Sequence, residues 1–295
     1  MPAAASVGPV SLLSHPYRSL RPLLGGHKQL RAEGRRPGSA LIWRLAEGAQ
    51  AEHARMVRER PGGVALVVVL PPAPRIRVDP DLLRIVEASR PQAILPHHDP
   101  ILVEDLTQVL RRPPEDLAAE VTEYVVWRGV VLDRETVHVL RKTLLLSAEL
   151  RSISALSRSL YLSRRALGRR LLSRGLPVPS HWLQLGRLLR VAIRLQNSSE
   201  SVLSIGYEVG YADAFSLSNQ MHRLTGFRPS EAREYLGWEW LLEAWLCEEA
   251  RTGGLAPEYA FDLLTGSPRS RDEAPATRQA SARASRTPRD ARTGS

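Results

Sequence analysis

The side chains best suited to recognise a ligand fall into two clusters in the second half of the chain. One cluster contains Arg164, Arg165 and Arg169, and the other contains Ser216 and Asn219. A guanidinium group can donate two hydrogen bonds to guanine or hold a phosphate, and an asparagine amide can read adenine through paired bonds. The residue types therefore favour hydrogen bonding to the base edges and phosphates of a nucleic acid.

The first cluster falls in a predicted helix-turn-helix unit at residues 152–174. Ser163 can cap the second helix of this unit by accepting a hydrogen bond from a free backbone amide, and Leu167 and Leu171 would point inward. The arginines would then lie on the outward face, which in such a unit enters the major groove of DNA. The apolar face of the supporting helix would consist of Ile153, Leu156 and Leu160.

The second cluster falls in a similar predicted unit at residues 201–226. Gly210 can adopt the left-handed conformation of the turn, and Asp213 can cap the helix that follows. The inward face of this unit would consist of Val202, Ile205, Val209, Leu217, Met221 and Leu224. Small polar side chains remain on the outward face, so this short helix is expected to touch base edges rather than only solvent.

Between the two units, residues 180–196 form one continuous amphipathic pattern. A helix of this length would be about 25 Å long, which approaches the ~34 Å between successive major-groove faces. The spacing predicts that one subunit reads two adjacent turns of a duplex.

The positive charge of the chain is concentrated in the same region. The chain has 41 Lys and Arg residues against 31 Asp and Glu residues, which gives a formal net charge of +10. Residues 151–235 contain 13 Arg against 5 acidic residues, so most of the excess lies there. Arginine on an isolated helix is usually only solvated surface, but two such units with this charge favour an anionic partner such as nucleic acid.

These pieces resemble the C-terminal DNA-binding domain of the AraC family of transcription regulators. The resemblance covers about residues 135–236 and rests on the stretches L-S-R-R-A-L-G-R-R-L, R-L-L-R-V-A-I-R-L, S-I-G-Y-E-V-G-Y-A-D and T-G-F-R-P-S-E. It implies sequence-specific binding to promoter DNA through a recognition helix in each unit. The candidate DNA-binding residues are Ser163, Arg164, Arg165, Gly168, Arg169, Arg170, Arg187, Asp213, Ala214, Ser216, Ser218, Asn219 and Arg223.

Three residues depart from the usual pattern of this family. Asn219 stands where Arg is usual, Gly206 where Ala is usual, and Arg228 where Thr often caps a helix. Glycine inside a helix costs ~0.5–1 kcal/mol relative to alanine, so Gly206 is expected to weaken its helix. Many relatives also carry a cupin-type β-barrel sensor, whereas the N-terminal pattern of this chain is not of that type.

The N-terminal part alternates between strand and helix patterns. Strands are predicted at residues 41–45, 64–70 and 92–95, and helices at residues 50–59 and 79–89. This alternation predicts a small α/β domain with a parallel sheet, followed by an all-α domain that contains the two helix-turn-helix units joined by a long helix.

The predicted organisation has five parts. Residues 1–37 and 248–295 have compositions typical of a flexible N-terminal arm and a disordered tail. Between them we predict an α/β sensor or dimerisation domain at 38–112, a helical linker at 113–134 and the double helix-turn-helix domain at 135–247.

The main alternative is an enzyme whose N-terminal α/β domain binds a nucleotide or phosphoryl group and which the DNA-binding domain only localises. No acidic pair follows the first predicted strand, and Pro71 and Pro72 follow the second. No Gly-rich phosphate loop or nucleophile with its base stands out, so a regulator that is not an enzyme, with no cofactor and no metal, is favoured. Adjacent His97 and His98 would be awkward joint metal ligands. Non-specific architectural binding to DNA is a third open alternative.

Partners and location follow from the same features. Cys247 is the only cysteine, so no intrachain disulfide can form, and the longest apolar run, residues 64–70, is too short to span a bilayer. The first residues lack the pattern of a secretory signal. These features predict a cytoplasmic protein with no membrane partner. The expected partner is double-stranded promoter or operator DNA, while RNA polymerase, homodimerisation through the N-terminal domain and an unidentified effector are left open.

Overall fold

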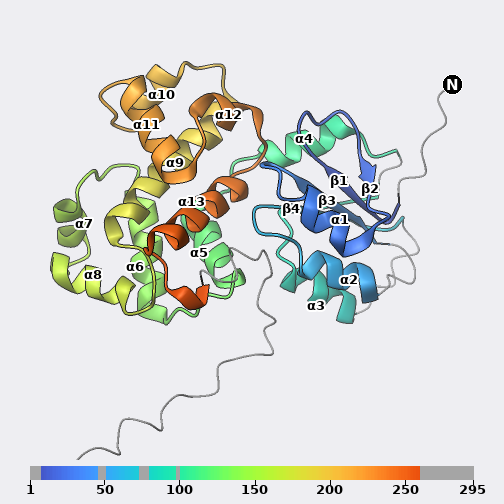
Figure 1. Cartoon of the computed structure of the whole chain (residues 1–295), viewed down its shortest axis with the longest axis horizontal. Helices are drawn as coiled ribbons and strands as arrows, with labels where there is room; N and C mark the ends of the chain where they lie inside the picture. Colours follow the sequence, from blue (N-terminus) through green and yellow to red (C-terminus); the bar gives the residue numbers. More distant parts are fainter. Residues whose placement is uncertain (1–7, 46–50, 73–79, 98–99, 260–295) are drawn as a thin grey trace, which may run out of the picture.

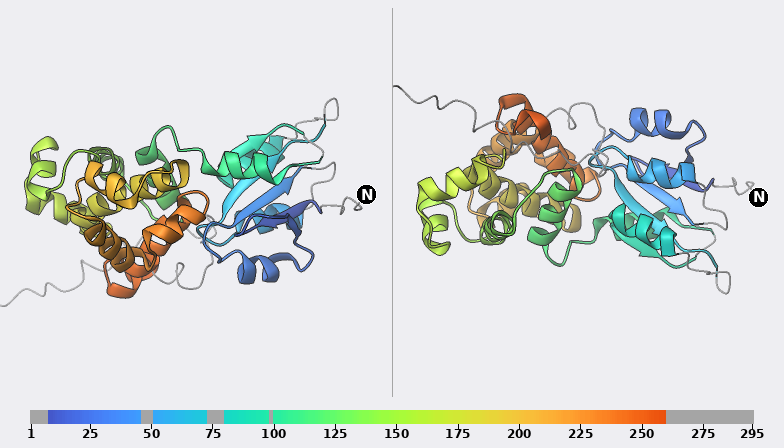
Figure 2. Two further views of the ribbon diagram at one scale, coloured as in Figure 1. Left: turned by 90° about the horizontal axis from the view of Figure 1, so that it is seen from above. Right: turned by 90° about the horizontal axis from the view of Figure 1, so that it is seen from below.

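The chain folds into an N-terminal domain with a β-sheet and a C-terminal domain made of helices (Figure 1). The computed structural model describes residues 8–45, 51–72, 80–97 and 100–259. The two domains lie side by side in both views of Figure 2. The predicted order, an α/β domain followed by an all-α domain, is confirmed.

The sheet has five strands in the order β2-β1-β3-β4-β5. β3 pairs with β4, and β4 with β5, in parallel, which confirms the parallel arrangement predicted for these three strands. β1 adds an antiparallel pair on each side, with β2 and with β3, so the sheet is mixed rather than purely parallel. The strands are β1 Val10–Leu13, β2 Arg21–Pro22, β3 Ala40–Arg44, β4 Ala65–Val69 and β5 Ala93–Leu95.

Helices cover both faces of this sheet (Figure 2). Successive side chains of a strand point to opposite faces, so Leu41 and Trp43 pack with α1, α2 and α3, whereas Ala40 and Ile42 pack toward α4. The crossover helices α2 and α3 both lie on the first face, as expected for consecutive β-α-β units. The helices of this domain are α1 Gly26–Glu33, α2 Ala51–Arg58, α3 Pro80–Ala88 and α4 Val103–Arg111.

The prediction of a flexible arm over residues 1–37 is wrong for its described part. β1, β2 and α1 all lie in this segment, and the four residues of β1 are buried. A strand of four residues between Pro9 and Ser14 is too short to give a periodic signal. It forms because its backbone pairs along β3, from Val10 opposite Trp43 to Leu13 opposite Ala40. Residues 1–7 lie outside the described residues.

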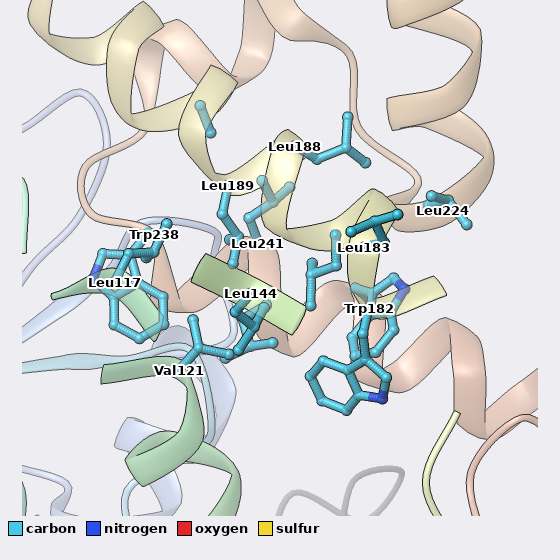
Figure 3. Close-up of a cluster of buried hydrophobic side chains, with 14 of the residues drawn as sticks. Leu117, Val121, Leu144, Trp182, Leu183, Leu188, Leu189, Leu224, Trp238 and Leu241 are labelled. Carbon is cyan, nitrogen blue, oxygen red and sulfur yellow. The ribbon is translucent and has the colours of Figure 1, made fainter. Parts of the chain in front are cut away.

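The helices of the C-terminal domain share one apolar core (Figure 3). Val121 from α5, Leu144 from α6 and Leu189 from α9 meet Leu241 from α13 in its centre, and all four side chains are almost completely buried. The helices are α5 Leu117–Trp127, α6 Arg134–Leu146, α7 Ile153–Ser159, α8 Arg164–Leu172, α9 Pro179–Asn197, α10 Val202–Glu208, α11 Ala214–Thr225, α12 Pro229–Glu234 and α13 Glu239–Thr252.

Two predicted boundaries differ from the structure. α5 falls in the predicted linker, residues 113–134, but its apolar side chains belong to the core of the helical domain. α13 continues past residue 247 to Thr252, so the first residues of the predicted tail are helical. The rest of that prediction, residues 260–295, lies outside the described residues.

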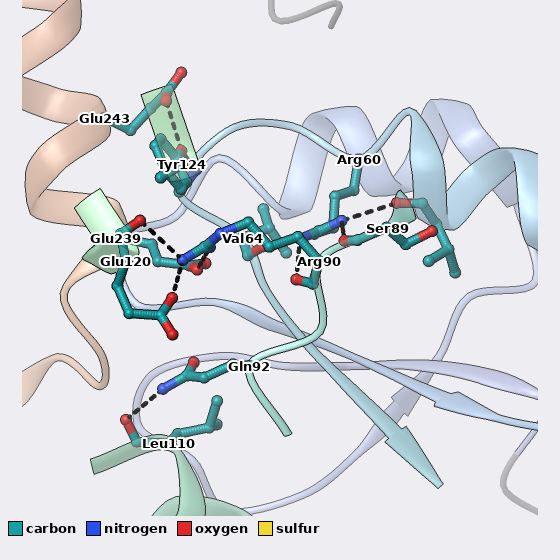
Figure 4. Close-up of polar contacts among 12 residues, drawn as sticks. Arg60, Val64, Ser89, Arg90, Gln92, Leu110, Glu120, Tyr124, Glu239 and Glu243 are labelled. Carbon is teal, nitrogen blue, oxygen red and sulfur yellow. Dashed lines mark hydrogen bonds and ion pairs between the residues drawn. The ribbon is translucent and has the colours of Figure 1, made fainter. Parts of the chain in front are cut away.

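A buried arginine, Arg60, contacts the helical domain directly and also bonds within its own sheet domain, for example to the Ser89 carbonyl (Figure 4). The Arg60 side chain is completely buried, and its guanidinium lies 4.5 Å from the centre of the Trp127 ring of α5. Burial lowers the pKa of Arg60 to about 10, so the group remains protonated at neutral pH. It donates hydrogen bonds to the carbonyls of Val57, Val64, Ser89 and Arg90 at 3.2, 2.9, 2.6 and 3.1 Å.

A second arginine, Arg90, crosses the same boundary. It forms ion pairs with Glu120 of α5 and Glu239 of α13. Its guanidinium lies 5.4 Å from the ring centre of Tyr124 and 5.5 Å from that of Trp238. These contacts join the two domains, and the Arg90 and Glu239 side chains that form the second ion pair are both largely buried.

Candidate nucleic-acid interface

α7 and α8 form the first predicted helix-turn-helix unit. The Ser163 hydroxyl accepts a hydrogen bond from the backbone amide of Ala166 at 3.1 Å, which confirms the predicted cap of α8. Leu167 and Leu171 are completely buried, as predicted for the inward face. The exposed outer residues of α8 include Arg164, Arg165 and Arg169.

α10 and α11 form the second unit. The carboxylate of Asp213 accepts hydrogen bonds from the amide and the hydroxyl of Ser216 at 2.6 and 3.0 Å, which confirms the predicted cap of α11. These hydrogen bonds hold the pKa of Asp213 below its ordinary value, and the one from the backbone amide of Ser216 has the larger effect. The inward residues Leu217, Met221 and Leu224 are buried, as predicted. Of the predicted contact residues on this helix, Ser216, Asn219 and Arg223 are exposed, and Ala214 and Ser218 are half-buried.

α9 joins the two units as a buried strut of 19 residues. Trp182 near its start lies against Trp245 of α13, with ring centres 4.6 Å apart. Near its end, Arg194 forms ion pairs with Glu200 and with Glu208 of α10. Both ends of the helix are therefore fixed, one to the core and one to the second unit.

Arg187 of α9 does not fit its predicted role in DNA binding. Its side chain is only 9% exposed, and its guanidinium lies 5.6 Å from the centre of the Tyr211 ring. It joins α9 to the turn before α11. The prediction was wrong because α9 is enclosed on more sides than its two-faced sequence pattern indicates.

The arginines of α8 and of the segment just after it form two groups, those that are in an ion pair and those that are not. Arg170 pairs with Glu135, and Arg174 pairs with Asp133, so these two hold α8 against the start of α6. Within the described residues, Arg164, Arg165 and Arg169 form no ion pair. Their charges are available to an external anion, whereas the charge of Arg170 is already compensated.

Gly168 lies on the exposed side of α8 and leaves an open space there. A Cβ atom placed on this residue would have no neighbour within 4 Å. Its presence is therefore not required by packing within the described residues. A flat helix surface at this position allows a ligand to approach the backbone closely.

The turn of the second unit contacts the start of the first unit. Gly210 has a φ of 87°, and a Cβ atom on it would lie 2.1 Å from the Nε atom of Arg151. The guanidinium of Arg151, immediately before the cap of α7, thus packs against the turn between α10 and α11. The two units are neighbours, and both lie on the side of the helical domain away from the sheet (Figure 1).

Phe215 is an exposed residue of α11 that the sequence reasoning missed. It lies in the first turn of the helix, between Ala214 and Ser216, and its side chain is 75% exposed. A signal was present in the sequence: the inward positions of this helix begin at Leu217, so a large apolar residue two positions earlier falls on the opposite face. The exposed face of α11 therefore offers an apolar group beside its polar ones.

Two other features, a metal site and a membrane-spanning helix, are absent from the described residues. There, no group of three or more His, Cys, Asp or Glu side chains is arranged to hold a metal ion. His98 and Asp99, which follow His97, lie outside the described residues. In the same part of the chain, no helix is both long and apolar enough to cross a membrane.

Comparison with known proteins identifies the same region. Residues 156–235 match a family model described as a helix-turn-helix domain, and the match runs from α7 to the end of α12. No curated protein and no solved structure matches the chain significantly.

Proposed function

The chain carries a helix-turn-helix domain of the AraC type at residues 156–235, and from this premise we propose that it regulates transcription by reading two adjacent major-groove segments of a promoter. A DNA-binding regulator of this type is the role that the domain supports. The proposal adds which helices enter the grooves, namely α8 and α11, and what each contributes.

The observation that carries the proposal is the difference between the arginines of α8 that are free of ion pairs in the described part of the chain and the one that is already in an ion pair. Arg164, Arg165 and Arg169 are exposed and form no ion pair within the described residues, while Arg170 is paired with Glu135. An exposed, uncompensated guanidinium can bond guanine bidentately or hold a phosphate. We assign base reading to Arg165 and Arg169, and a phosphate contact to Arg164 near the start of the helix.

α11 would read the second segment mainly through small and uncharged side chains. Asn219 is exposed and can donate to and accept from adenine, and Phe215 can contact the methyl group of thymine. Ser216 and Ser218 allow close approach of the helix, and Arg223 is placed one turn further along for a phosphate. Ser163 and Asp213 would act indirectly, since their side chains cap the two recognition helices.

The helix α9, which joins the two units, has a suitable length for placing them in successive major-groove segments. A helix of 19 residues is about 28 Å long, and successive major-groove faces lie ~34 Å apart. Because both ends of α9 are fixed to neighbouring elements, the spacing of the two recognition helices would be set by the fold rather than by the DNA.

We place signal sensing or dimerisation in the sheet domain, which is joined to the helical domain through Arg60 and Arg90. The loops after β3, β4 and β5, where an open α/β sheet usually binds ligands, contain residues 46–50, 73–79 and 98–99, which lie outside the described residues. The enzymatic alternative therefore gains no support from a described site.

Selection of bound duplexes from a random DNA library tests the proposal. We expect one motif with two boxes whose centres are about 10–10.5 base pairs apart. Arg165→Ala should relax the preference in one box only, and Asn219→Ala in the other, each by ~1–3 kcal/mol of discrimination. Arg84→Ala, on the exposed surface of α3, is the matched control and should select the unchanged motif. If both reader variants still select the wild-type motif, the assignment of the readers is wrong.

Competition with excess random DNA separates this proposal from architectural binding. A sequence-specific regulator should keep its selected site, because specific affinity exceeds non-specific affinity by ~10³-fold or more. Loss of binding to the selected site at equal concentrations of random duplex would favour the architectural alternative.

A further inference from the structure

The turn of the first helix-turn-helix unit contains an unusual residue, Tyr161. Its φ is 53°, in the left-handed region, where the Cβ atom of an L-residue approaches the neighbouring carbonyl oxygen. The amide of Tyr161 donates to Arg158 at 3.1 Å, and that of Leu162 donates to Ser157 at 3.0 Å. These two hydrogen bonds close the end of α7 in a left-handed turn.

The second unit closes the same turn with glycine. Gly210 has a φ of 87° and donates to Tyr207 at 3.0 Å, and Tyr211 donates to Gly206 at 2.9 Å. The hydrogen-bond pattern is the same as in the first unit. Glycine adopts this conformation without strain, so the tyrosine at the equivalent place is the costly choice.

The backbone strain at Tyr161 is not offset by hydrogen bonds or ring contacts of its side chain in the part of the chain that the structure describes. It is 96% exposed, and within the described residues it makes no hydrogen bond or ring contact. A strained residue whose side chain is fully presented to solvent indicates a functional constraint from outside the chain.

Tyr161 borders a groove between α6 and the turn of the first unit, which we call the α6 groove. The groove encloses about 650 Å³. Val139 and Leu146 of α6 line one side, and Leu160 and Leu162 of the turn line the other. Its floor is therefore apolar, and an exposed aromatic ring stands at its edge.

The rim of the α6 groove carries a row of basic side chains. Arg134, His138 and Lys142 follow one another at intervals of four residues along α6, so they share one face of the helix. All three are exposed, and none forms an ion pair within the described residues. Glu135, the acidic residue of the groove, is compensated by Arg170.

We propose that the α6 groove binds an acidic amphipathic helix of a partner protein, with Tyr161 as its aromatic anchor. The apolar face of such a helix would cover the leucine-lined floor, and its acidic side chains would meet the basic row of α6. Duplex DNA matches the basic rim but offers little apolar surface for the floor. A second copy that docked through the same groove would place two basic rows against each other, and their mutual repulsion disfavours it as the occupant.

The test uses the full chain and a fluorescent synthetic peptide of about 15 residues, roughly four helical turns, with Leu on one face and Glu on the others. Binding is followed by fluorescence anisotropy at about 150 mM salt, where long-range attraction between exposed charges is screened. The same peptide with Lys in place of Glu is the charge control. We expect saturable binding of the acidic peptide and none of the basic one.

Three variants locate the binding surface. The double variant Arg134→Glu and Lys142→Glu, and separately Tyr161→Gly, should each weaken peptide binding about tenfold, a change of ~1.4 kcal/mol. Tyr161→Gly should also raise the melting temperature, because it removes strain, so a loss of binding would not reflect misfolding. The control Arg165→Glu with Arg169→Glu should abolish binding to the selected DNA and leave peptide binding unchanged.

Several outcomes would overturn the proposal. One is equal peptide binding by the wild type and by the α6 or Tyr161 variants. Another is an equal loss in the Arg165 and Arg169 variant, which would show attraction to positive charge in general. A third is a Tyr161→Gly variant that loses affinity for DNA but not for the peptide, which would assign the ring to the duplex. The first two outcomes concern peptide binding alone, so they do not depend on whether the two recognition helices read the promoter as proposed.

Discussion

Arg90 and Glu239 form an ion pair across the boundary between the sheet domain and the helical domain (Figure 4). The side chain of Glu239 is 4% exposed and that of Arg90 is 14% exposed, so the pair is shielded from water. Glu120 pairs with the other side of the same guanidinium. Each charge is tolerated there because the opposite charge is in place.

Removal of Arg90 should therefore destabilise the chain strongly. Arg90→Ala leaves Glu239 buried without its partner, and we expect a loss of ~3–5 kcal/mol in the free energy of unfolding. Urea unfolding of the full chain measures this. Arg84→Ala is the matched control, since its ion pair with Asp81 is about 78% exposed and should contribute ~1 kcal/mol or less. Similar losses in both variants would show that the interdomain pair is not energetically special.

Two helical glycines allow stability and DNA binding to be separated. Gly168→Ala and Gly206→Ala should each raise the free energy of unfolding by ~0.5–1 kcal/mol, because alanine is the better helix former. At Gly168 the added Cβ meets nothing within 4 Å, and at Gly206 it makes an ordinary contact of 3.4 Å with Leu217. Thermal unfolding of both variants measures the gain.

The two glycine variants should differ in their affinity for the selected DNA. Gly168 lies on the outer face of α8, where an added methyl group would meet the duplex, so Gly168→Ala should bind more weakly although it is more stable. Gly206 is buried within the second unit, and Gly206→Ala should bind as the wild type does. Equal affinities of the two variants would place Gly168 outside the interface.

Acid should remove the contribution of the Asp213 cap. Hydrogen bonds from Ser216 hold the pKa of Asp213 below its ordinary value, so the carboxylate stabilises the fold above the unfolded-state pKa of ~3.9. This contribution is lost as the pH falls through the lower folded-state pKa. Asp213→Asn keeps a cap acceptor that does not titrate. The stability difference between wild type and Asp213→Asn should therefore shrink between about pH 6 and about pH 2.

Ser163→Ala provides the non-titrating control for this experiment. It removes the cap of α8, and the expected loss of ~1 kcal/mol should be the same across the whole pH range. A loss for Ser163→Ala that changes with pH as the Asp213→Asn difference does would mean that the acid effect arises elsewhere in the chain.

Salt dependence should distinguish the free arginines of α8 from the paired one. Each phosphate contact contributes ~0.9 to the slope of log K against log salt concentration, so Arg164→Ala should lower the slope by about that amount. Arg170→Ala removes a charge that is already compensated by Glu135 and should leave the slope nearly unchanged. A larger change for Arg170 than for Arg164 would contradict the division of charge that supports the proposed function.

The sequence predicted those features that are set by local patterns. The caps at Ser163 and Asp213 and the buried positions Leu167 and Leu217 follow from helix periodicity and capping chemistry, and the structure has them as predicted. The parallel strands also follow from the alternation of helix and strand patterns. Each of these depends on residues that lie close together in the chain.

Features that depend on distant residues could not be predicted in the same way. β1 forms because its backbone pairs with β3 some thirty residues later, and Arg187 is buried because Tyr211 covers it. The pairing of Arg170 with Glu135 likewise depends on how α8 packs against α6. The spacing of residues along one helix predicts the face on which an arginine lies, but it does not predict which acidic residue of another helix pairs with that arginine. Phe215 is different, since its position opposite the inward face was visible in the sequence.

The exposed ring of Phe215 leads to the sharpest test of base reading by α11. If the ring contacts a thymine methyl group, replacing that thymine with uracil removes one methyl and should cost the wild type ~0.8 kcal/mol of binding free energy. Phe215→Ala should bind the thymine and uracil duplexes equally. Affinities of the two proteins for the two duplexes, measured by fluorescence anisotropy, give the coupling energy between the ring and the methyl group.

Ser216→Ala, the exposed neighbour on the same turn, should keep the wild-type response to uracil. A coupling energy of zero at every thymine of the second box would mean that Phe215 faces away from the bases, and the docking of α11 would then have to be rotated about its axis.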